Sequence, residues 1–83
     1  MKRLGVVGIV VENRDIVPEV QTLLSGFSDI ILGRMGIPDR DSGFSAISVV
    51  VKGTVEEISS LTGKLGKLKD VLVKSALTGA EIE

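Results

Sequence analysis

The segment LGVVGIVVE, Leu4–Glu12, is a short run of β-branched residues bounded by polar ones, and it predicts a strand. Its two faces are both apolar: Val7, Ile9 and Val11 alternate with Leu4, Val6, Gly8 and Val10. The segment FSAISVVVK, Phe44–Lys52, repeats the pattern, with Ile47, Val49 and Val51 against Phe44, Ala46, Ser48 and Val50. Two such strands are predicted to lie at the centre of one sheet.

The residues between these strands predict a helix and a further strand. We expect Asp15 to cap the helix, Pro18 to lie in its first turn and Gly26 to mark its end. Apolar residues recur at helical spacing in this segment: Ile16, Val20, Leu23, Leu24 and Phe27. Asp29–Gly36 predicts the second strand, which a turn-rich loop joins to Phe44–Lys52 as a hairpin.

A second helix and a fourth strand come next in the chain. Thr54 and Glu57 have the spacing of a capping box, and Gly66 is expected as the C′ residue. The buried stripe of this helix is predicted to comprise Val55, Ile58, Leu61, Leu65 and Leu68. Asp70–Leu77 predicts the last strand, and we expect Thr78–Glu83 to form a loose tail.

The order βαββαβ is typical of the α+β ferredoxin-like sandwich. We therefore expect one domain over residues 1–83, with an antiparallel sheet in the strand order 4-1-3-2 and two helices on one face. The other sheet face, with Val6, Val10, Phe44 and Val50, would then be exposed to water. Because an apolar patch of that kind usually marks an interface, we expect a homo-oligomer formed through the uncovered face or the sheet edges.

The amino-acid composition excludes several classes of function. Ten basic and eleven acidic residues give a net charge of −1, so DNA contact is expected only indirectly or through a partner protein. The absence of Cys and His from the chain excludes thiolate zinc sites and Ser–His catalysis, and we expect no metal, no cofactor and no enzymatic activity. The apolar run after Met1-Lys2-Arg3 is too short to span a membrane, so a cytoplasmic protein is expected.

Two places could bind a ligand. Arg34 lies mid-strand near Gly36, where open backbone would surround a bidentate anion binder; edge protection or an ion pair is the alternative. Asn13 and Arg14 lie where backbone N–H groups at a helix start can hold an anion; simple capping is the alternative. The loop segment Asp39–Asp41 could place two carboxylates near a metal, but a solvated turn is the more ordinary interpretation.

Four segments of the sequence are distinctive when taken together: GIVVENR (8–14), ILGRMGIP (31–38), ISVV (47–50) and LTGKLG (61–66). Through these segments, of which GRMGIP is the most specific part, the chain resembles the family of iron-only hydrogenase system regulators. It implies a small ACT-like domain, similar to the effector halves of ACT proteins and of the nickel-responsive repressor. Without His or Cys, a nickel site of that repressor's type is not expected. Asn13 and Arg14 match the start of the ACT ligand loop, whereas Ile16 and Val17 replace its glycine.

Two functions stay open. One is a regulatory module of an iron-only hydrogenase system, oligomeric and binding a small anionic effector at a subunit interface near Asn13, Arg14, Arg34 and Gly36. The other is a structural or assembly protein that uses the same interface without a ligand.

Overall fold

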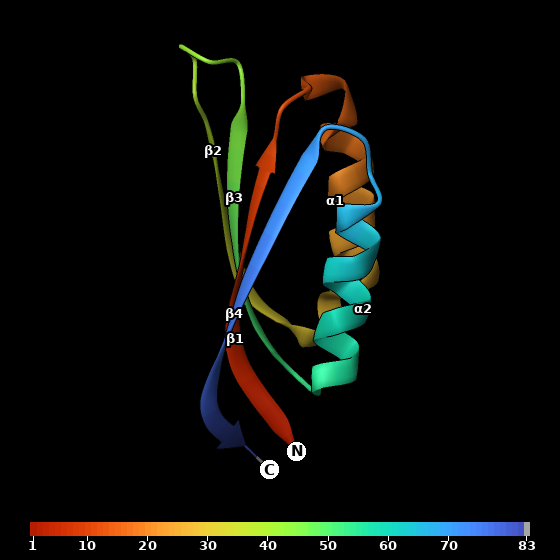
Figure 1. Ribbon diagram of the computed structural model, residues 1–83, viewed down its shortest axis with the longest axis vertical. Helices are drawn as coiled ribbons and strands as arrows, with labels where there is room; N and C mark the ends of the chain where they lie inside the picture. The colour runs from red at the N-terminus through yellow and green to blue at the C-terminus, as the bar shows by residue number, and fades with distance from the viewer. Residues whose placement is uncertain (83) are drawn as a thin grey trace.

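The computed structural model describes residues 1–82 and has two layers, a sheet and a pair of helices (Figure 1). In chain order the elements are β1 (Lys2–Val11), α1 (Val17–Gly26), β2 (Ile31–Pro38), β3 (Ser45–Gly53), α2 (Val55–Gly66) and β4 (Val71–Ile82). Short 3-10 turns, Arg14–Ile16 and Ser28–Ile30, precede α1 and β2.

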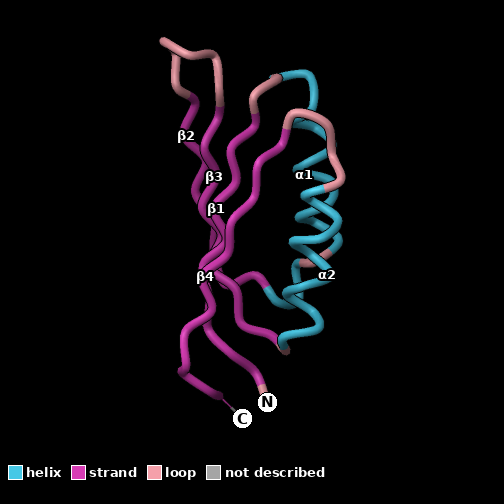
Figure 2. Tube along the Cα trace, viewed as in Figure 1, coloured by secondary structure: helices cyan, strands magenta, loops and turns pink. Residues whose placement is uncertain are grey.

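The sheet has the strand order β2-β3-β1-β4, and all of its neighbouring strands are antiparallel. This is the predicted order read from the opposite edge. Both helices lie on the same side of the sheet, as Figure 2 shows, so the predicted ferredoxin-like arrangement is confirmed. The opposite side of the sheet has no covering layer among residues 1–82.

The core lies between the helices and the inner face of the sheet. Alternate residues of the two central strands point into it and are fully or almost fully buried: Val7, Ile9, Val11, Ile47, Val49 and Val51. They meet the helix residues Val20, Leu24, Ile58, Leu61 and Leu65. The predicted division of the strands into two apolar faces is therefore confirmed, and the inner face forms the core.

The predicted capping box starts α2. The Oγ1 atom of Thr54 accepts a hydrogen bond from the Glu57 backbone N–H at 3.1 Å, and the Glu57 carboxylate accepts one from the Thr54 N–H at 2.9 Å. The prediction for the other end of α2 was wrong, because Gly66 is still helical and Lys67 follows it with φ −83°. The left-handed residue is instead Asp70, φ 63°. The extra residues bring Leu68 against the core before the chain reverses into β4.

The predicted cap of α1 was also wrong. Asn13, rather than Asp15, provides the capping oxygen: its Oδ1 accepts from the Asp15 N–H at 3.0 Å and caps a 3-10 turn. The α-helix begins only at Val17 and has no side-chain cap, while Pro18 lies in its first turn and Gly26 ends it, as predicted.

Thr78 to Ile82 do not form the loose tail that we expected. They continue β4, with Lys2 opposite Ile82 and an irregularity in the pairing between Arg3 and Gly5. The Thr78 hydroxyl donates to the Leu4 carbonyl at 2.9 Å, and Arg3 forms an ion pair with Glu81 at 3.7 Å. Glu83, the last residue of the predicted tail, lies outside the described residues.

Candidate functional site

The outer face of the sheet consists of side chains arranged in three rows that run across all four strands. From β2 through β3 and β1 to β4, the rows are Gly33–Val50–Val6–Ala76, Met35–Ser48–Gly8–Lys74 and Ile37–Ala46–Val10–Leu72. Lys74 is the one charged side chain among these twelve. We call these twelve residues the outer face.

Large apolar side chains of the outer face are exposed to solvent. Met35 is 61% exposed, Leu72 57% and Ile37 55%, and Val6 and Val50 are also exposed. The predicted exposure of Val6, Phe44 and Val50 is thereby confirmed, whereas Val10 is half-buried. Exposed apolar side chains that adjoin one another form a patch, and such patches usually mark an interaction surface.

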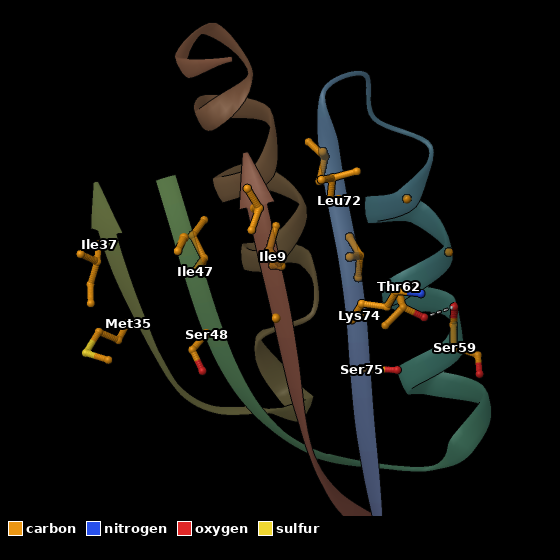
Figure 3. Close-up of a pocket in the computed structure, with 17 residues that line it drawn as sticks. Ile9, Met35, Ile37, Ile47, Ser48, Ser59, Thr62, Leu72, Lys74 and Ser75 are labelled. Carbon is orange, nitrogen blue, oxygen red and sulfur yellow. Dashed lines mark hydrogen bonds between the residues drawn. The ribbon is translucent and has the colours of Figure 1, made fainter. Parts of the chain in front are cut away.

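The outer face is hollowed along its middle. Gly8, Ala46 and Ser48 are small residues on the two central strands, and they line one broad depression with larger side chains of both edge strands. Figure 3 shows Met35 and Ile37 on β2, Leu72 and Lys74 on β4, and Ser48 between them. The depression continues past β4 to the small residues Ser59 and Gly63 of α2.

A second hollow lies at the end of the sheet that carries the β2–β3 hairpin. It is lined by Arg14, Val17, Pro38, Arg40 and Ser45, and we call it the arginine hollow. Arg14 comes from the turn after β1, and Arg40 from the tip of the hairpin. Two arginines from distant parts of the sequence thus line one hollow.

The hairpin tip is held by its own hydrogen bonds. The Ser42 hydroxyl donates to the Asp39 carboxylate at 2.7 Å, and this bond is the main cause that lowers the pKa of Asp39 below its usual value. The Gly43 N–H donates to the Asp39 carbonyl at 2.9 Å, and Gly43 has the positive φ, 78°, that a glycine adopts without strain. The Asp39 carboxylate is therefore engaged with Ser42.

Arg14, Arg34 and Arg40 form no ion pair within residues 1–82. Within residues 1–82, the only ion pair joins Arg3 and Glu81. Arg14, Arg34 and Arg40 are exposed and have no carboxylate oxygen within 4.0 Å in that part of the chain. A guanidinium group in that state keeps its paired N–H donors for an oxyanion.

The structure separates the residues that the sequence grouped. Arg34 pairs in register with buried Val49, so it points to the helix side of β2, and it lines another hollow with Ser25 and Ser28. That hollow shares no residue with the arginine hollow.

The other predicted site residues also lie apart. Gly36 lies on the same side as Arg34, where an added Cβ would meet Ile47 Cγ1 at an ordinary 3.8 Å. Asn13 caps the turn through its side chain, and Arg14 lines the arginine hollow. Ligand contact at these four residues stays a prediction.

Arg40 and Ser45 are candidate site residues that the sequence did not reveal. The segment Asp39–Asp41 reads as a solvated turn, and its position beside Arg14 is a result of the long-range pairing of β1 with β3. A correct prediction would have needed the register of β1 with β3. In that register Val11 lies opposite Ser45, so the residues just beyond each of them approach one another.

Two further findings concern the described residues. Residues 1–82 contain no group of three Asp or Glu side chains placed to hold a metal ion. Neither helix of this part of the chain has the length and apolar composition needed to cross a bilayer.

Comparisons with known proteins agree with this geometry. Residues 3–75 match the TM1266-like family, described as iron-only hydrogenase system regulators. The uncharacterised protein TM1266 from Thermotoga maritima has 36% sequence identity to the chain and a TM-score of 0.88, over 93% of this chain and 98% of that one. No curated protein is significantly similar to the chain in sequence.

More distant structures share the fold. The ACT domain of GTP pyrophosphokinase from Chlorobium tepidum has a TM-score of 0.76 at 18% identity, over 92% of this chain and all of that domain. The C-terminal domain of the MgtC protein from Mycobacterium tuberculosis has a TM-score of 0.74 at 13% identity, over 98% of this chain and 94% of that domain. The chain therefore belongs to the family of iron-only hydrogenase system regulators and has an ACT-like fold.

Proposed function

We propose that the chain is a non-catalytic, cytoplasmic regulatory module of an iron-only hydrogenase system, and that it responds to a small anion bound in the arginine hollow. Family membership and the ACT-like fold support the regulatory part of this proposal. Any effect on transcription would pass through a partner protein, because basic and acidic residues are nearly balanced and the net charge is −1.

The observation that carries the anion proposal is the pair of arginine residues that line one hollow. Arg14 and Arg40 belong to different segments, and neither has a carboxylate partner among residues 1–82. A planar guanidinium binds carboxylate and phosphate oxygens through two parallel N–H donors, and two of them can hold opposite sides of one oxyanion. Ser45 also lines the hollow.

The structure changes which residues are proposed as ligand contacts. Arg14 is retained and Arg40 is added, while Arg34 lines a separate hollow beside Ser25 and Ser28. We therefore assign Arg34 no part in this anion site. Its substitution serves as a control, because Arg34 has the same charge and is also exposed.

A thermal-shift titration tests the proposal, with inorganic phosphate, pyrophosphate and glutamate as probes. An anion at ten times its dissociation constant stabilises the folded state by about 1.4 kcal/mol, which raises Tm by several degrees for a domain of this size. Arg14→Gln and Arg40→Gln should each remove the shift, whereas Arg34→Gln should keep it.

Two results would contradict the proposal. The first is no shift with any of the three probes at millimolar concentration. The second is an equal loss of the shift in Arg34→Gln and Arg40→Gln, which would indicate diffuse charge attraction rather than a site. Either result would favour the alternative function, an assembly protein that acts through protein contacts without a ligand, for which the exposed apolar outer face is the supporting observation.

A further inference from the structure

We infer that the outer face binds the outer face of a second copy of this chain, and that a two-fold axis runs across the strands along the row Met35–Ser48–Gly8–Lys74. This inference does not depend on the proposed anion site, which lies at the hairpin end of the molecule. It rests on the surface area of the chain, the extent and charge of the outer face, and the order of large and small side chains within it.

The chain exposes more surface than a compact monomer of its mass. Its accessible surface is 5219 Å², whereas the mass of 8.8 kDa predicts about 4,800 Å² for a folded monomer. The molecule is also elongated, with extents of 41 × 19 × 16 Å. A flat layer with one uncovered side accounts for both observations.

The uncovered side is large enough for a dimer. Four strands spaced about 4.8 Å apart, and the five outward positions from Phe44, just before β3, to Lys52, near the end of β3, span roughly 19 × 33 Å. Stacking two such faces would bury roughly 600 Å² on each copy, and the total of about 1,200 Å² reaches the lower end of specific interfaces. Lys74, on an edge strand, is the only charged side chain of the twelve, and Lys52 lies at one end of the span, so the middle of the face suits an apolar partner.

The order of side-chain sizes selects a second copy as that partner. One outer row is small at both ends, with Gly33 and Ala76, and the other is large at both ends, with Ile37 and Leu72. A two-fold axis along the row between them lays each row on the other. Gly33 then meets the second copy's Ile37, and Ala76 meets its Leu72.

The same axis suits the two central strands. It lays Val50 on the second copy's Ala46 and Val6 on its Val10, so each pair adds a larger side chain to a smaller or equal one. Gly8 and Ser48 lie on the axis itself, where small side chains let the sheets approach closely. Lys74 also lies on the axis, but on edge strand β4, where its ammonium group can reach solvent.

Sedimentation velocity across the micromolar range tests the dimer. The chain should sediment with a mass twice 8.8 kDa. Gly8→Lys should leave only the monomer, because it places two like charges on the axis at a central strand, where they cannot reach solvent as Lys74 can at the edge. The folded chain tolerates a side chain at Gly8, since a Cβ there meets nothing nearer than the Lys74 carbonyl at 3.7 Å. Gln21→Lys, on the exposed side of α1, adds the same charge elsewhere and should keep the dimer.

A size swap tests the position of the axis. Leu72→Ala opens a gap opposite Ala76, and Ala76→Leu overfills the space opposite Leu72, so each should weaken the dimer by about tenfold or more. The double variant exchanges the two sizes and should return the dissociation constant close to its original value. A monomer at all concentrations, or a dimer unaffected by Gly8→Lys, would overturn the inference. A dimer that Gly8→Lys breaks but the swap does not restore would overturn the axis.

Discussion

The two faces of the sheet are built from the same four strands, yet their apolar residues have different roles. On the middle of the central strands, the inner face carries only Val and Ile, and these residues are buried against the helices. The outer face places Gly8, Ala46 and Ser48 on those same strands, among larger exposed side chains. Hydropathy marks both faces as apolar, but the order of side-chain sizes distinguishes a permanent core from a surface that another layer can cover.

The largest expected effect comes from shortening one leucine on each face of the sheet and comparing the losses of stability. Leu61→Ala, in the fully buried core, should lower the free energy of unfolding by between about 2 and 5 kcal/mol. Leu72→Ala, at an exposed outer-face position, should cost less than about 1 kcal/mol when the protein is dilute enough to be monomeric. Urea unfolding of both variants measures the difference, and equal losses would show that the outer face stabilises the isolated chain.

Two glycines of β1 extend the comparison. A Cβ at buried Gly5 would lie 2.6 Å from Leu77 Cδ2 and 3.0 Å from the Ala76 carbonyl, so Gly5→Ala should cost about 1–2 kcal/mol. Gly8→Ala, on the outer face, meets only ordinary contact and should change the stability of the dilute chain by less than about 1 kcal/mol in either direction. Thermal unfolding at low protein concentration checks the pair, and the contrast between the faces fails if the two variants melt together.

Removal of the α2 cap should have an intermediate effect. Thr54→Ala leaves the Glu57 N–H without its acceptor and should cost about 1 kcal/mol of unfolding free energy. Thr54→Ser keeps the hydroxyl and is the matched control, with little loss expected. Chemical denaturation measures both, and a loss of the same size in the Ser variant would assign the effect to the Thr methyl group instead.

The smallest effect concerns pH. The hydrogen bond from the Thr54 N–H is the main cause that lowers the pKa of Glu57 below its ordinary 4.5. The unfolded chain therefore binds this proton more readily, so the contribution of Glu57 is complete above pH 4.5 and is lost as the pH falls through the lower folded pKa. Glu57→Gln should flatten that part of the stability profile, and an unchanged acid slope in urea titrations would contradict the assignment.

The fold was predictable because its signals are local. Alternating β-branched residues marked the central strands, and the Thr54–Glu57 spacing marked the start of α2. The errors fall where distant pairing decides the structure. Residues Thr78 to Ile82 have little strand character of their own and become a strand only because Lys2 to Leu4 lie beside them.

The candidate site was less predictable for the same reason. Arg14 was recognised from its place after β1, but Arg40 reads as a turn residue until the hairpin is placed beside that turn. Arg34 and Arg14 look like one group in sequence because each lies in or beside a β-rich segment. The register of β2 with β3 puts Arg34 next to α1 instead.

The pairing of Lys2 with Ile82 brings both ends of the described chain together at the end of the molecule opposite the β2–β3 hairpin (Figure 1). A two-fold axis across the strands sets the ends of one copy beside the hairpin of the other. Tags on either terminus of two paired chains would therefore stay apart. A tandem gene that joins two copies would need a linker to cover the 41 Å length of the molecule, which takes at least about 12 extended residues.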